Sequence, residues 1–117
     1  MYKINISNKV VILEKNVFGG CENLNEITIP YGMINIGDGA FEECKSLREV
    51  SIPDSVASIG DYAFWNCQSL NQITVWSNVT SIGYSAFDGC KNLTIRAFKG
   101  SYAERYALEN EIPFEEI

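Results

Sequence analysis

Four cysteines recur at a fixed interval, and their thiols are the most reactive groups that the sequence repeats. Cys21, Cys44, Cys67 and Cys90 are each separated by 23 residues. A fixed interval gives every cysteine the same place in its repeat, so we expect the side chains to point inward together as a ladder. Parallel side chains have poor geometry for a disulfide, although rungs about 5 Å apart are close enough for one. Because cysteine often packs as a small hydrophobic residue, we predict buried free thiols.

The metal-binding patterns that such residue types could form are missing. A zinc site needs histidines or paired cysteines, and this sequence has no histidine and no C-x-x-C. Asp38 and Asp61 share a place in the repeat, but calcium needs more oxygen ligands, as in a D-x-D-x-D-G loop. The sequence also lacks a glycine-rich phosphate loop. We therefore predict no metal and no cofactor.

Two carboxylates one repeat apart, Glu26 and Glu49, are the strongest candidates for acid-base chemistry. On neighbouring strands they would lie roughly 5 Å apart, which is the separation of a retaining glycosidase pair. A regular sheet surface is flat, however, and excludes no water from such a pair. A histidine for a nucleophilic triad is also missing. We therefore predict two solvated glutamates and a protein that is not an enzyme.

The two tryptophans are the strongest candidates for ligand binding. Trp76 stands where Pro30 and Pro53 stand in other repeats, and exposed tryptophan is enriched at binding hot spots. In the alternative interpretation each ring lies flat over its neighbours and covers the rim of the structure. Trp65 occupies a place that in the other repeats is polar or small, namely Gly19, Glu42 and Asp88.

These residues are positioned by a repeat of 23 residues that runs through nearly the whole chain. Rows of equivalent large apolar residues keep the same register as the cysteines: Phe18, Phe41, Phe64 and Phe87, then Leu24, Leu47, Leu70 and Leu93. Together with the cysteines, these make three rows in one register, which indicates a solenoid whose coils stack on one another. Such a protein presents a long surface for recognition more often than a closed catalytic pocket.

Each coil is predicted to contain one main strand and a return arc. The alternating β-branched segment 50–52 and its equivalents 27–29 and 73–75 predict strands that pair in parallel. The arc should consist of short turns, 3₁₀ pieces and a short second strand. Its glycine row indicates a positive φ or a close approach between coils: Gly37, Gly60 and Gly83. The exposed face of the sheet should carry the outward residues of the strands: Glu26, Glu49, Gln72, Thr28, Ser51 and Thr74.

The two ends of the chain differ. Met1 falls on the leucine row, so the sequence starts inside a coil without a polar cap, and solenoids normally cover such an end. We infer the C-terminal part of a longer array, or an end covered by another subunit through end-to-end self-association. At the other end, Ser101 and Glu104 form a capping box, which predicts a short helix to about Glu109.

Charge and hydropathy exclude two classes of partner. The formal net charge of −6 over 117 residues argues against nucleic acid and against anionic membrane surfaces. No apolar run approaches the roughly 18 residues that a membrane span requires. The first six residues lack the apolar core of a signal peptide.

The run from Ile52 to Leu70, IPDSVASIGDYAFWNCQSL, resembles the BspA-type leucine-rich repeats. The resemblance covers roughly residues 4–96, and residues 100–114 are similar to the usual end of such arrays. It implies a right-handed leucine-rich repeat solenoid, mostly β, with a parallel sheet. Residues 1–117 would then form a single domain with coils over about 4–96 and a C-terminal cap at 97–117. The resemblance also implies a bacterial surface or secreted protein with adhesive roles and no general catalytic residues.

We therefore hypothesise a protein-interaction module that binds host or matrix proteins through the exposed sheet face. One alternative is a structural spacer within a larger surface protein, and another is carbohydrate binding, with a glycan as the partner. Flanking anchors and a separate effector domain would favour the spacer. The sequence does not identify the partner.

Overall fold

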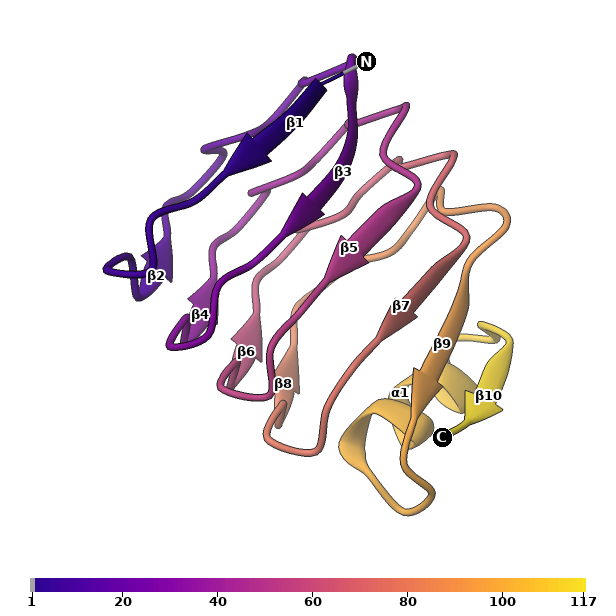
Figure 1. Ribbon diagram of the computed structural model, residues 1–117. Helices are drawn as coiled ribbons and strands as arrows, with labels where there is room; N and C mark the ends of the chain where they lie inside the picture. The colour runs from indigo at the N-terminus through magenta and orange to yellow at the C-terminus, as the bar shows by residue number, and fades with distance from the viewer. Residues whose placement is uncertain (1) are drawn as a thin grey trace.

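The protein is a solenoid of about five turns built from two parallel sheets (Figure 1). The computed structural model describes the backbone of residues 2–117 and the side chains from Ile6 onward. Sheet A consists of β1 (Tyr2–Asn5), β3 (Leu24–Thr28), β5 (Glu49–Ser51), β7 (Gln72–Thr74), β9 (Thr94–Ala97) and β10 (Phe114–Glu116). Sheet B consists of β2 (Ile12–Leu13), β4 (Asn35–Ile36), β6 (Ser58–Ile59) and β8 (Ser81–Ile82). The chain also forms one helix in the described part, α1 (Tyr102–Glu109).

The register between coils confirms the predicted spacing. Glu26 pairs with Glu49, and Glu49 pairs with Gln72, each 23 residues further along. The central strands β5 and β7 start one residue earlier than predicted, which is within the usual variation of strand boundaries. The short second strand expected in each arc is present and forms sheet B.

A ladder of phenylalanine rings fills the space between the sheets. Phe18, Phe41, Phe64 and Phe87 stack in sequence, with centroid distances of 5.4, 5.1 and 5.3 Å. The planes of successive rings differ by 17° or less. This near-parallel stack confirms that the phenylalanine row is internal, and Phe41 and Phe64 are fully buried.

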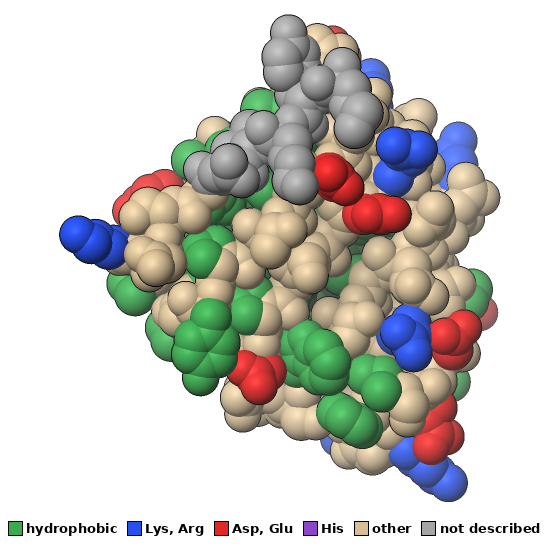
Figure 2. All heavy atoms as spheres, viewed as in Figure 1, with side chains coloured by type: hydrophobic (Ala, Val, Ile, Leu, Met, Phe, Trp, Pro, Cys, Tyr) green, Lys and Arg blue, Asp and Glu red, His purple; other side chains and the backbone are tan. Residues whose placement is uncertain are grey.

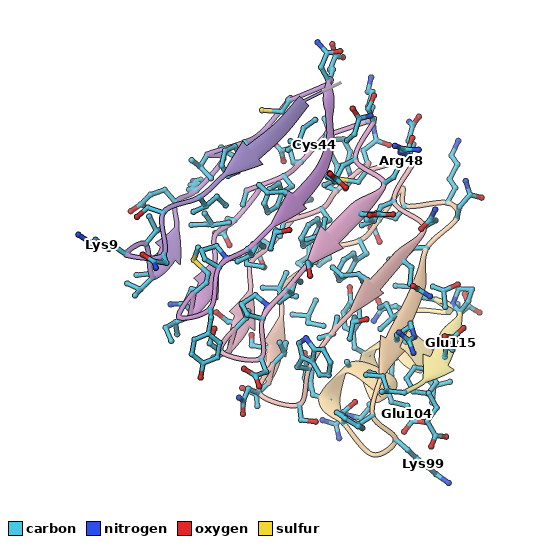
Figure 3. The ribbon with its side chains drawn as sticks, in the orientation of Figure 1. Lys9, Cys44, Arg48, Lys99, Glu104 and Glu115 are labelled. Atoms are coloured by element: carbon cyan, nitrogen blue, oxygen red, sulfur yellow. The ribbon has the colours of Figure 1, made fainter. Side chains whose placement is uncertain are left out.

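The cysteine ladder lies beside the rings, and all four thiols are free. The Sγ of Cys44 donates to the Phe18 carbonyl, and that of Cys67 donates to the Phe41 carbonyl, at 3.1 Å in each case. Cys44 lies within the layer behind sheet A (Figure 3). Full burial is confirmed for these two thiols, whereas Cys21 and Cys90 at the ends of the ladder are only half-buried.

The glycine row marks a close approach between coils rather than a positive φ. The Oδ1 atom of Asp38 accepts a hydrogen bond from the Asp61 amide at 2.9 Å, which places Asp38 directly against Gly60. A Cβ on Gly60 would lie 2.6 Å from the Asp38 nitrogen, where no real Cβ fits. Asp61 repeats the arrangement one coil later by accepting from the Tyr84 amide at 2.8 Å. The two aspartates therefore connect coils.

The C-terminal helix covers the last coil, as the capping motif predicts. Ser101 accepts from the Glu104 amide at 3.2 Å, and Glu104 in turn accepts from the Gly100 amide at 2.8 Å. Ala103 and Ala107 are the buried residues of this helix. Residues 2–117 include no helix long and apolar enough to cross a membrane. Met1, which we placed on the leucine row, lies outside the described residues.

Candidate interaction surface

A shallow hollow of about 240 Å³ lies on the exposed face of sheet A, over β3, β5 and β7. We call it the strand-face hollow. It brings together all six outward strand residues that the sequence singled out. Its lining consists of Glu26, Thr28, Glu49, Ser51, Gln72 and Thr74, together with Ile27, Val50 and Asn71.

The alternation of the strands produces this polar lining. Ile27 and Val50 point into the core, with 2% and 7% of their surface exposed, so their neighbours in the strand must face outward. Glu26 and Glu49 face each other across neighbouring strands, and Gln72 continues the same row. Like charges directly opposite each other destabilise a sheet. The stability of sheet A therefore does not explain why both positions carry glutamate.

Charge and apolar surface separate along the strands on this face. Figure 2 shows acidic side chains over the upper ends of β3 and β5, and hydrophobic side chains gathered along the lower edge, where the strands end. Arg48 stands at the upper rim (Figure 3). At the C-terminal end of the sheet the Nε atom of Arg96 pairs with Glu115 at 2.8 Å. A ligand lying along a strand would therefore meet both kinds of surface.

Trp76 follows the end of β7 and packs against the coils on both sides. Its indole Nε1 donates to the Ile52 carbonyl at 2.7 Å, so the ring bridges to the preceding coil. The ring centroid lies 6.1 Å from that of Phe98. The side chain is half-buried, and the ring edge that carries the N–H is already occupied by a protein partner. Trp76 is not one of the residues that line the strand-face hollow, and what it can offer a ligand is ring surface rather than its N–H.

Trp65 lies away from this surface. It belongs to the arc between β6 and β7, which runs behind sheet A (Figure 1), and its ring meets Tyr62 edge to face at 6.4 Å. The structure thus brings six of the eight candidate residues into one hollow, while Trp76 follows the end of β7 and Trp65 lies on the return arc. The sequence reasoning missed Tyr62 and Tyr84, although both break their rows just as Trp65 does.

The chemistry available in the strand-face hollow is that of recognition. Carboxylates accept hydrogen bonds, while amide and hydroxyl groups both donate and accept them. The lining residues supply all three kinds of group. The hollow is open to solvent, so it lacks the water exclusion by which catalytic sites strengthen electrostatic interactions.

The sequence matches the model of the BspA type leucine rich repeat region over residues 1–112, in six copies. No curated protein matched the chain. Among solved structures, the chain is similar to a leucine rich cell surface protein from Faecalibacterium prausnitzii, with 41% identity and a TM-score of 0.69. That similarity covers 72% of this chain and 22% of the other.

A second similar structure is a leucine rich repeat protein of T. pallidum, with 26% identity and a TM-score of 0.59. Here the similarity covers 74% of this chain and 52% of the other. The chain therefore spans between about a fifth and about half of the length of these two structures.

Proposed function

This chain belongs to the BspA-type leucine-rich repeat family, and we propose that it binds a protein partner through the strand-face hollow. The family occurs in bacterial surface proteins, and its repeats generally serve in protein interaction. The observation that carries the proposal is the lining of the hollow, where six outward residues from three successive coils form one polar surface.

Two features of this surface support a protein partner. The hollow is shallow and spans three parallel strands, so it suits an extended segment or a protruding loop better than a small molecule that must be enclosed. The hydrophobic side chains gathered where the strands end add the apolar contact that usually supplies binding energy at interfaces, and the half-buried Trp76 ring follows β7 there.

The setting that we propose is the bacterial cell surface or the secreted fraction. The cell surface protein from Faecalibacterium prausnitzii shares the fold and 41% of the aligned sequence. Adhesion to host or matrix proteins is the role that such a setting favours. The whole protein's partners are part of the same proposal, since the chain spans only a portion of its structural relatives.

The proposal is tested by measuring the binding of residues 1–117 to an array of purified matrix and mucosal proteins. We expect saturable binding to at least one of them, weakened about fivefold or more by Glu49→Ala combined with Gln72→Ala, because interface hot spots cost more than about 1 kcal/mol. The matched control combines Glu22→Ala with Thr80→Ala, two exposed positions outside the hollow. The absence of any binder, or equal weakening by both pairs, would refute the proposal.

A further inference from the structure

Three aromatic side chains meet on the outer surface of the return arc, at a distance from the strand-face hollow. The centroid of the Tyr62 ring lies 6.4 Å from that of the Trp65 ring and 5.8 Å from that of the Tyr84 ring. The planes are nearly perpendicular in both pairs, at 86° and 83°. Tyr84 is 73% exposed and Tyr62 is 40% exposed. We call these three residues the aromatic patch.

Each member of the aromatic patch breaks the row to which it belongs. Equivalent positions elsewhere carry small, polar or charged residues: Asn16, Gly39 and Ser85 for Tyr62; Gly19, Glu42 and Asp88 for Trp65; Lys15, Asp38 and Asp61 for Tyr84. The other coils form the same arc without any of these rings. The solenoid therefore does not require them, and three independent departures from the repeat converge at one place.

The backbone at Tyr62 makes this departure unfavourable. Its φ is +57°, and the equivalent Asn16, Gly39 and Ser85 share the left-handed conformation, with φ of 56°, 62° and 52°. Glycine and asparagine adopt that region readily, whereas a tyrosine there is uncommon and strained. Strained residues cluster at functional sites such as ligand clamps, so the strain at Tyr62 agrees with a binding role for its exposed ring.

The charged residues in the three rows of the aromatic patch are mostly negative. Glu42 and Asp88 flank Trp65 in its row, one coil before and one coil after. Asp61 lies directly beneath Tyr84, since its Oδ1 accepts the Tyr84 amide at 2.8 Å. Across the three rows the only basic residue is Lys15, two coils away from Trp65. The aromatic faces and the carboxylates thus present negative potential together.

We propose that the aromatic patch binds basic side chains of a protein partner, with arginine or lysine seated against the rings and the carboxylates. The face of an aromatic ring attracts a cation within about 6 Å of its centroid, and perpendicular rings form the walls of a cage for it. The same contact already occurs within this chain, where the Arg105 guanidinium lies 5.6 Å from the centre of the Tyr102 ring.

The ring geometry favours this partner over a neutral glycan. A sugar stacks on a ring face or on rings that together form a flat platform, whereas adjacent rings of the aromatic patch stand at right angles. A neutral sugar would also leave the negative charge of the carboxylates uncompensated. The patch lies on the arc rather than on sheet A, so the inference stands without the proposed function.

The experiment is an NMR titration of residues 1–117 with a hexapeptide of alternating arginine and glycine. The matched probe is the same peptide with neutral citrulline in place of arginine, and maltohexaose tests the glycan. We expect the arginine peptide to shift the Trp65 indole and the Tyr62 and Tyr84 ring signals in a saturable manner that salt weakens. Citrulline peptide and maltohexaose should leave these signals in place.

Variants complete the test. Tyr84→Ala should weaken the arginine peptide about two- to fivefold, the usual size of one exposed cation–π contact. Tyr62→Asn, which installs the residue of Asn16, should do the same while keeping the backbone conformation. Tyr31→Ala removes an equally exposed tyrosine elsewhere and should change nothing. Equal binding of both peptides, a response to maltohexaose alone, or arginine binding that ignores Tyr84→Ala and Tyr62→Asn would overturn the proposal.

Discussion

At the scale of single residues, the phenylalanine ladder shows how strongly the core depends on one side chain. Phe64 is fully buried and lies 5.1 Å from Phe41 and 5.3 Å from Phe87, measured between ring centroids. We predict that Phe64→Ala lowers the free energy of unfolding by about 3–5 kcal/mol, because it removes a transfer contribution and leaves a cavity. Urea denaturation measures this loss. Phe18→Ala, at the half-buried end of the ladder, should cost clearly less, and equal losses would contradict the prediction.

The cysteine ladder makes stability depend on pH in the alkaline range. Burial raises the pKa of the Cys44 thiol from 9.0 to about 12. Above pH 9 the unfolded chain loses this proton while the folded chain keeps it. The contribution of this thiol to the free energy of unfolding is therefore full below pH 9 and is lost as the pH rises toward 12. The slope for one such group is about 1.4 kcal/mol per pH unit at most.

We predict that urea midpoints fall between pH 9 and pH 10.5 and that Cys44→Ala makes this fall shallower. Burial likewise raises the pKa of Tyr106 from 10.0 to about 12, which adds to the fall above pH 10. Cys21→Ala is the comparison, since Cys21 is only half-buried. A slope unchanged in Cys44→Ala would show that this thiol ionises equally in both states.

The surroundings of residues that repeat could be predicted from the sequence, and so could the C-terminal helix from its capping box, whereas the surroundings of the two tryptophans could not. The phenylalanine and cysteine rows fix their own neighbours, because each residue packs against its equivalent one coil away. Trp76 and Trp65 have no equivalents, so their surroundings depend on unrelated residues such as Phe98 and Tyr62. The bond from Trp76 to the Ile52 carbonyl spans 24 residues, and no local pattern in the sequence announces it.

At the scale of elements, helix α1 depends on its N-terminal cap. Ser101 accepts the Glu104 amide, satisfying one of the donors that every helix start leaves without a partner. We predict that Ser101→Ala lowers the free energy of unfolding by about 1 kcal/mol. Ser77→Ala, an exposed serine outside the helix, should change it little. Urea denaturation compares the two variants, and equal stabilities would show that this cap contributes nothing.

The conformation of the return arc could be predicted from the sequence only in part. The glycine row was predicted to reflect either a positive φ or a close approach, and the sequence alone could not decide between these. The structure decides for close approach, because the carboxylate of Asp38 occupies the space where a Gly60 side chain would stand. The two rows had to be considered together to reach that conclusion, since the aspartate belongs to one coil and the glycine to the next.

At the scale of the whole molecule, the repeat separates what sets the fold from what sets recognition. Inward rows are nearly invariant from coil to coil, and they account for the two sheets and the core between them. Outward positions of the strands carry polar residues, and the sequence correctly gathered six of them on one face because strand alternation alone determines where they point. The aromatic patch escaped prediction because its members come from irregular arcs, where no alternation links sequence to direction.

Stability should also vary along the solenoid, because each coil contacts only its neighbours. In the first coil Val17 is 46% exposed, whereas its equivalents in the next two coils, Ala40 and Ala63, are fully buried. For the polypeptide of residues 1–117 we predict that amides near Leu13 exchange with deuterium faster than those near Ile59. Phe64→Ala should speed exchange in the flanking coils, around Phe41 and Phe87, before it affects the first coil. Uniform exchange along the chain, or an equal effect of Phe64→Ala on every coil, would mean that the solenoid unfolds as one unit.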